Sequence, residues 1–256
     1  MIRQLYAAFF LVSLSAQPIP VHPLEIGSPD QLAINLREKR AIPKSDCDKL
    51  ELWECRPDDT SRSGDISIRW VQLDDDPELE ALIVMQAPAE NTYAAFVFDK
   101  RKSWNLVGAF FDRQWKLDAS SFLEAGKLTE DSPTLLLVHR DLGGSGSALF
   151  TTEAFHLRQG QLWPALTVTN AAFSYLPAPG SVTRETLFSS GNFLIIHKNT
   201  QTLAGELVSN TCEAQRWTQA RRAFVRAPEA DATYCDRTTG KPFKEKSRWA
   251  GLKYYP

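Results

Sequence analysis

Between residues 66 and 210 the chain consists mainly of short apolar segments separated by polar or glycine-bearing turns. In ISIRWVQL, the side chains of Ile66, Ile68 and Trp70 alternate with polar ones, which is typical of a strand with one buried face. Similar segments follow it: LEALIVMQ, YAAFVFD, WNLVGAFFD, TLLLVHRD, ALFTTEAFHL, QLWPALTV, TLFSS, NFLIIHK and GELVSN. The sequence therefore predicts an all-β fold, mainly an antiparallel meander.

One short helix is expected before these strands. In GSPDQLAINLREKRAIP, Ser28 is suited to the N-cap, Pro29 to the first helical position, and Gln31 to a capping box. Basic residues precede Pro43, by which the helix should have ended. Helical patterns are almost absent from the rest of the chain.

Two of the expected hairpins resemble each other. Residues 96–107 align with residues 155–166 at a constant offset of 59, which pairs Phe96 with Phe155 and Trp104 with Trp163. A fainter third copy surrounds Trp217. Stacked units of this kind predict a propeller-like or multi-sheet protein, although amphipathic hairpins also resemble one another by chance.

The first twenty residues indicate export. Arg3 precedes an apolar run from Leu5 to Leu14, and small residues follow it before Pro18, as in a cleavable signal peptide. We expect residues 1–16 to be this signal peptide and the mature chain to be secreted or periplasmic. The apolar run is too short to cross a bilayer, and no longer one follows, so no membrane span is expected in the mature chain.

Export makes disulfides the expected state of the four cysteines. Three pairings are possible, and we favour Cys47 with Cys55 and Cys212 with Cys235 because the nearer partners meet first. Neither pair has the CxxC-type spacing of a zinc site.

Charge divides the chain into an acidic front and a basic tail. Residues 46–80 hold twelve acidic and four basic side chains, a net charge of −8, whereas residues 214–256 hold four acidic and ten basic ones, a net charge of +6. The charge distribution and the helix, strand and cysteine patterns together predict three segments after the signal peptide. Residues 17–60 hold the helix and one disulfide, residues 61–226 form a β-hairpin domain, and residues 227–256 form a basic, aromatic tail packed on that domain. The two charged regions attract each other within the fold or lie apart on solvated surfaces; the alternative is an anionic partner that binds the basic tail.

The most acidic stretch, WVQLDDDPELEALIV, resembles the calcium-binding turns of FG-GAP and VCBS-type repeats in extracellular β-propellers. The resemblance covers residues 70–84 and implies that Asp74, Asp76 and Glu80 are metal ligands. Gln72 occupies the first acidic position of the pattern, and Pro77 replaces its turn glycine.

The residues themselves leave two interpretations of this turn open. Five carboxylates within seven residues, Asp74 to Glu80, repel one another unless a cation or an arginine lies close, and Ca²⁺ prefers such oxygen ligands. A solvated β-turn in which these carboxylates point into water is the other interpretation. Calcium is the one cofactor that the sequence indicates.

No catalytic motif is present, and the catalytic residues of any enzyme activity stay unknown. The histidines His22, His139, His156 and His197 are scattered singly, and the last three lie in expected strands, where packing is their ordinary role.

The C-terminal tail interleaves basic and aromatic residues. Lys246, Arg248 and Trp249 form a candidate ligand-binding group for a polysaccharide or another partner in the cell envelope or outside the cell, while export argues against nucleic acid. Packing of these aromatic side chains on the sheet is the alternative. Together these features favour a non-enzymatic β-rich binding protein of unknown ligand; a secreted glycan hydrolase with two catalytic carboxylates is the second hypothesis.

Overall fold

The structure is a computed structural model that describes residues 17–37, 44–50, 65–87, 92–113, 123–144, 147–174, 180–243 and 248–249. Its helices are α1 (Pro29–Arg37), α2 (Lys44–Lys49) and α4 (Pro228–Tyr234). Its strands are β1 (Glu25–Ile26), β2 (Asp65–Val71), β3 (Glu80–Ala87), β4 (Thr92–Lys100), β5 (Trp104–Arg113), β6 (Leu123–Gly126), β7 (Leu135–Gly144), β8 (Ser147–Arg158), β9 (Gln161–Ser174), β10 (Ser181–Ser190), β11 (Phe193–Thr202), β12 (Leu207–Thr218), β13 (Ala223–Arg226), β14 (Cys235–Asp236), β15 (Lys241–Pro242) and β16 (Arg248–Trp249).

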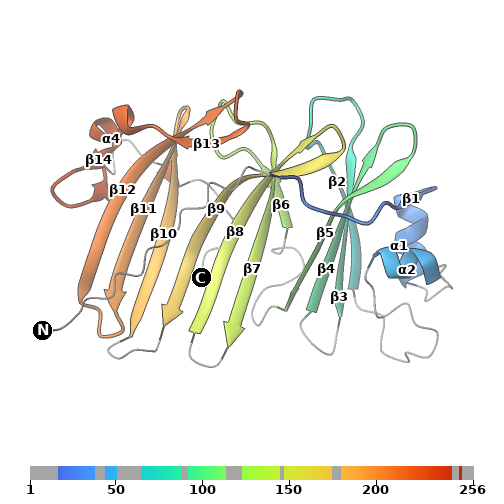
Figure 1. Cartoon of the computed structure of the whole chain (residues 1–256), viewed down its shortest axis with the longest axis horizontal. Helices are drawn as coiled ribbons and strands as arrows, with labels where there is room; N and C mark the ends of the chain where they lie inside the picture. The colour runs from blue at the N-terminus through green and yellow to red at the C-terminus, as the bar shows by residue number, and fades with distance from the viewer. Residues whose placement is uncertain are drawn as a thin grey trace, which may run out of the picture.

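Most of these strands belong to two antiparallel sheets. Sheet A has the strand order β1-β5-β4-β3-β2, and sheet B has the order β13-β12-β11-β10-β9-β8-β7-β6, with β16 paired to β10. Strands β14 and β15 form a small separate sheet. Within each sheet nearly every strand pairs with its neighbour in the sequence, so the topology is a meander, which Figure 1 shows as two adjacent rows of strands.

A hydrophobic core lies between the two sheets. Phe110 of sheet A packs on Phe155 of sheet B with 5.4 Å between ring centroids. The members of this core are Leu73, Leu82, Val84, Tyr93, Ala95, Val97, Val107, Phe110, Leu123, Leu136, Val138, Phe155, Leu157 and Leu162. Because successive side chains of a strand point to opposite faces, each sheet carries a second core on its other face. Sheet B curls around its own second core, to which β7, β13 and the strands between them contribute.

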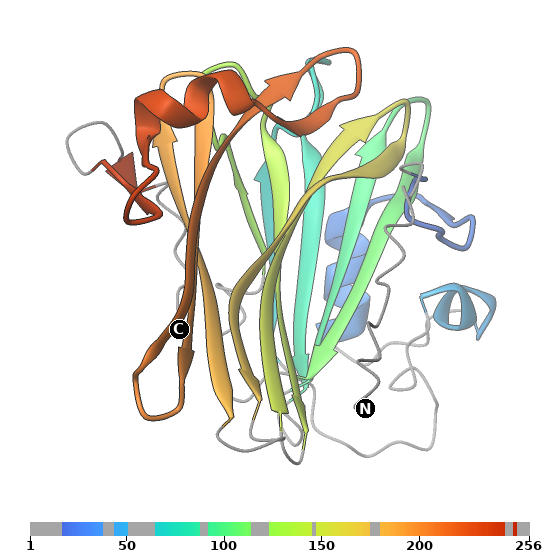
Figure 2. The ribbon, with the colours of Figure 1, turned by 60° about the vertical axis from the view of Figure 1, so that its left-hand side comes forward.

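Helix α1 covers the second core of sheet A, and in Figure 2 it lies against the strands of that sheet. The helix begins as the sequence predicts, since the Gln31 amide donates to the Ser28 hydroxyl at 3.4 Å and Pro29 occupies the first helical position. Leu32 and Leu36, one turn apart, are buried against the sheet. The Arg37 guanidinium donates to the Ile66 carbonyl at 2.9 Å and joins the helix to β2.

The predicted strands are confirmed. The prediction of a single helix is wrong, because the described residues include the three helices α1, α2 and α4. Each of the ten apolar segments lies in a strand, the two related segments form the hairpins β4–β5 and β8–β9, and the third copy forms β12–β13. The multi-sheet arrangement is confirmed, whereas the described residues show no propeller-like one. Helices α2 and α4 were not expected; both are short and lack the apolar periodicity that marks α1.

The last part of the chain is joined to sheet B. The predicted disulfide Cys212–Cys235 connects β12 to β14, with 5.6 Å between the Cα atoms. Strand β16 pairs Trp249 with Phe188, so at the backbone level the tail packs on the sheet. Cys55, the side chain of Cys47, Lys246 and the side chains of Arg248 and Trp249 lie outside the described part of the structure. No helix that it describes has the length and apolar composition needed to cross a bilayer.

Candidate metal centre

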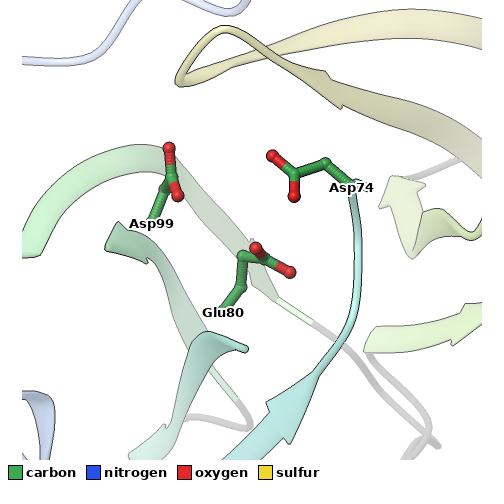
Figure 3. Close-up of side chains that lie close together, drawn as sticks. All are labelled: Asp74, Glu80 and Asp99. Carbon is green, nitrogen blue, oxygen red and sulfur yellow. The ribbon is translucent and has the colours of Figure 1, made fainter. Parts of the chain in front are cut away.

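Three carboxylates converge at one end of sheet A. Asp74 follows β2, Glu80 begins β3, and Asp99 lies near the end of β4. One oxygen of each carboxylate lies within 4.8 Å of the corresponding oxygens of the other two. Figure 3 shows the three side chains pointing toward a common space from three separate segments.

The register of sheet A explains this convergence. Strands β3 and β4 pair Ala81 with Phe98, so the residues one step outside this pair, Glu80 and Asp99, are neighbours at the end of the sheet. Their side chains point to the same face as Leu82 and Val97, toward sheet B. The turn between β2 and β3 adds Asp74 to them.

The side chain of Gln72 holds this turn in shape. Its amide nitrogen Nε2 donates to the carbonyls of Asp74 at 2.8 Å and Asp76 at 2.5 Å, and approaches that of Glu78 at 3.4 Å. Because these carbonyls accept from Gln72, they are already engaged inside the turn.

Two of the three carboxylates are buried and only half satisfied. Glu80 and Asp99 are each 1% exposed. Glu80 Oε2 accepts from the amide of Leu73 at 2.5 Å, and Asp99 Oδ2 pairs with the Arg101 guanidinium at 3.0 Å. The other oxygens, Glu80 Oε1 and Asp99 Oδ1, are buried without a hydrogen-bond partner. A buried charged oxygen without a partner costs free energy, so the site as it stands calls for a proton or a cation.

The surroundings oppose the ionised forms of these carboxyl groups. Burial, followed by the charges of Asp74 and Asp99, raises the pKa of Glu80 to about 7, although the Leu73 amide acts in the opposite direction. Burial is also the largest cause that raises the pKa of Asp74. In both cases burial disfavours the charged carboxylate, and the neighbouring carboxylates add to this effect.

The donor set fits a hard divalent cation. All three side chains offer carboxylate oxygens, the ligands that Ca²⁺ and Mg²⁺ prefer over nitrogen or sulfur. Oxygens on opposite sides of a Ca²⁺ ion are about 5 Å apart, because each Ca–O distance is about 2.3–2.6 Å. The observed limit of 4.8 Å accommodates such an ion.

The structure brings together two of the three predicted metal ligands and adds a third. Asp74 and Glu80 belong to the cluster, but Asp76 does not; its Oδ1 accepts from the Glu78 amide at 3.0 Å. Asp75 and Glu78 are exposed, so the solvated-turn interpretation describes that part of the turn. Sequence reasoning missed Asp99, whose one signal is its position directly after the buried run AAFVF.

A cavity of about 250 Å³ opens beside the cluster. Its acidic wall consists of Asp74, Asp75 and Asp76, and its basic wall includes Arg158 and Arg222. Asp74 belongs to both the cavity and the cluster, whereas Glu80 and Asp99 are not among the lining residues.

Comparison with known proteins identifies no relative of this chain. No family model, no characterised protein and no solved structure matches it. The function therefore has to be inferred from the site itself.

Proposed function

We propose that this protein is a non-enzymatic, secreted or periplasmic binding protein, and that a calcium ion bound by Asp74, Glu80 and Asp99 stabilises it. The observation that carries the proposal is the convergence of three carboxylates with two buried oxygens that lack a partner. A cation there would satisfy both oxygens and fix the turn after β2 to the ends of β3 and β4.

The predicted compartment agrees with this ion. The apolar N-terminal run indicates export, and the Cys212–Cys235 disulfide is typical of an oxidising compartment. The resemblance of the turn to FG-GAP and VCBS loops supports calcium, with Asp99 in place of Asp76 as the third ligand. A polysaccharide or another cell-envelope partner is the ligand class that the residues Lys246, Arg248 and Trp249 indicate.

The alternative of a glycan hydrolase has less support. A glycosidase needs two carboxyl groups that face its substrate across a cleft. Glu80 has the raised pKa of a general acid, but Glu80 and Asp99 are 1% exposed and do not line the neighbouring cavity. We therefore propose that these groups bind an ion and do not contact a substrate.

Calcium titration of the mature, oxidised protein tests the proposal. If the dissociation constant is about 10 μM, millimolar calcium adds about 2.7 kcal/mol to the free energy of unfolding. For a protein of this size, that raises the melting temperature by about 5–11 °C relative to the chelator-treated protein. Isothermal titration calorimetry should show one binding site.

Matched variants identify the ligands. Asp99→Asn should abolish both the heat of binding and the melting shift, whereas Asp75→Asn, an exposed position in the same turn, should retain them. Equal melting temperatures in calcium and in chelator, or a calcium response that survives Asp99→Asn, would refute the proposed site.

A further inference from the structure

The cavity beside Asp74 has walls of opposite charge. Asp74, Asp75 and Asp76 of the acidic turn form one wall, and the opposite wall, contributed by sheet B, includes His156, Arg158 and Arg222. Arg158 ends β8, and Arg222 lies in the turn between β12 and β13. The acidic region 46–80 and, through Arg222, the basic region 214–256 therefore meet at this cavity.

The basic wall has unused hydrogen-bond donors. Among the described residues, neither the Arg158 nor the Arg222 guanidinium forms an ion pair or a side-chain hydrogen bond. His156 Nδ1 is buried without a hydrogen-bond partner, while its ring packs on Trp217 with 5.7 Å between ring centroids. Guanidinium groups bind carboxylate and phosphate through paired N–H donors.

The backbone fixes the position of one of these arginines. Arg222 has a φ of 52°, in the left-handed region, and its amide donates to the Thr218 carbonyl. Gln159, the other described non-glycine residue with a positive φ, also lines the cavity. Two tight turns thus present the basic wall to the cavity.

The charge of the acidic wall affects how tightly the cavity can bind an anion. Three carboxylates repel an anion, and this repulsion offsets the attraction of the two guanidinium groups. A divalent cation on Asp74 offsets two of the three negative charges of that wall, because Asp74 belongs to both sites, and the two guanidinium groups then outweigh the remaining one.

We propose that this cavity binds the oxyanion group, a carboxylate or a phosphate, of a small ligand, and that bound calcium tightens this binding. The proposal rests on the calcium site proposed above and names the chemistry of the ligand. A volume of about 250 Å³ accommodates one such group or a single sugar and is smaller than a site for a large organic ligand.

Three probes built on one sugar ring test the proposed anion site by isothermal titration calorimetry: glucuronate, glucose 6-phosphate and glucose. With calcium-loaded protein, at least one of the two anions should bind saturably, and glucose should not. Calcium should tighten anion binding at least about fivefold, and the anion should tighten calcium binding by the same factor, because coupling between two sites is reciprocal. Binding of one anion and not the other identifies carboxylate or phosphate as the group.

Variants of the basic wall provide the controls. The double variant Arg158→Gln, Arg222→Gln should lose anion binding and retain the calcium affinity measured without anion, which also shows that it is folded. Arg221→Gln, at an exposed position in the same turn, should retain both.

Three results would overturn the proposal, and they are distinguishable. If calcium binds but neither anion changes its affinity, the anion site is wrong and the calcium site stands. If calcium does not bind, both proposals fail. Anion binding that is unchanged in the double variant would also exclude this cavity as the site.

Discussion

Folding strongly affects the ionisation of Glu80. Its carboxyl group is buried beside Asp74 and Asp99, with the Arg101 guanidinium paired to Asp99, and its pKa is raised from 4.5 to about 7. The folded chain therefore binds a proton that the unfolded chain releases between these values. This contribution to stability is fully present below pH 4.5 and is lost as the pH rises through about 7.

For the calcium-free protein we predict a free energy of unfolding that falls by about 3 kcal/mol over this range because of Glu80. Urea unfolding at a series of pH values measures it, and the difference between wild type and Glu80→Gln isolates it. That subtraction is necessary because burial and Arg222 lower the pKa of His156, which acts in the opposite direction. Calcium should remove the loss, since it favours the ionised carboxylate; the same pH dependence in Glu80→Gln and wild type would contradict this account.

A cluster of buried polar side chains lies on the face of sheet B that carries its second core. Thr152 Oγ1 accepts from the Asn170 amide at 2.6 Å and lies 2.8 Å from His139 Nδ1, and His139 Nε2 lies 3.3 Å from Glu124. Thr152, His139 and Asn170 are all buried. Sequence reasoning identified His139 as a packed or surface strand residue, but its burial and its partners on other strands depend on the register.

We predict that Thr152→Val lowers the free energy of unfolding by about 1–3 kcal/mol, because it leaves buried polar atoms of His139 and Asn170 without a partner. Chemical unfolding measures the change. Thr167→Val, at an exposed position on β9, is the control and should alter stability by less than about 0.5 kcal/mol. Equal stability of the two variants would mean that this hydrogen-bond group contributes nothing.

At the level of strands and helices, the sequence predicts the parts whose pattern is local. Alternation at Ile66, Ile68 and Trp70 identifies β2, and the offset of 59 identifies two hairpins, because a strand with one buried face leaves a period of two in the sequence. Helix α4 was missed since it has seven residues and no apolar stripe, although Pro228 at its start was a usable signal.

The candidate metal site could be predicted only in part for a related reason. Asp74 and Glu80 lie close together in the sequence, whereas Asp99 reaches them through the pairing of β3 with β4. Asp76 has the same residue type and spacing as a ligand, but it does not belong to the cluster, although Asp74 and Asp76 each accept from an amide two residues later in the turn. Residue type selects the candidates, and the register and local hydrogen bonds determine which of them meet.

Two glycine substitutions test how closely β14 and β15 pack on β12 of sheet B. Gly240 has a φ of 64°, and a Cβ atom added there would lie within 3 Å of the Asn210 carbonyl oxygen, a backbone atom of β12. Gly191 has a similar φ of 56° but open space around it. Gly191→Ala should therefore destabilise the protein by about 1 kcal/mol, the cost of the conformation alone.

We predict that Gly240→Ala is more destabilising than Gly191→Ala by at least about 1 kcal/mol, because the added methyl group separates β14 and β15 from β12. Thermal unfolding of the oxidised protein compares the two variants. Equal melting temperatures would show that this contact is not close in solution.

At the scale of the whole molecule, two sheets share one core, and the acidic turn lies at the end of sheet A that faces sheet B. The proposed calcium site and the cavity are therefore at the junction of the two sheets. Occupation of the site would stabilise the turn in a single position against sheet B and would prepare the cavity for its ligand.

A crystal structure of the mature protein grown in calcium tests the central claim most directly. With data collected where calcium scatters anomalously, we predict one anomalous peak about 2.3–2.6 Å from carboxylate oxygens of Asp74, Glu80 and Asp99. An absence of the peak, with Glu80 and Asp99 sharing a proton through a short hydrogen bond, would contradict the account and show that protonation alone satisfies these buried oxygens.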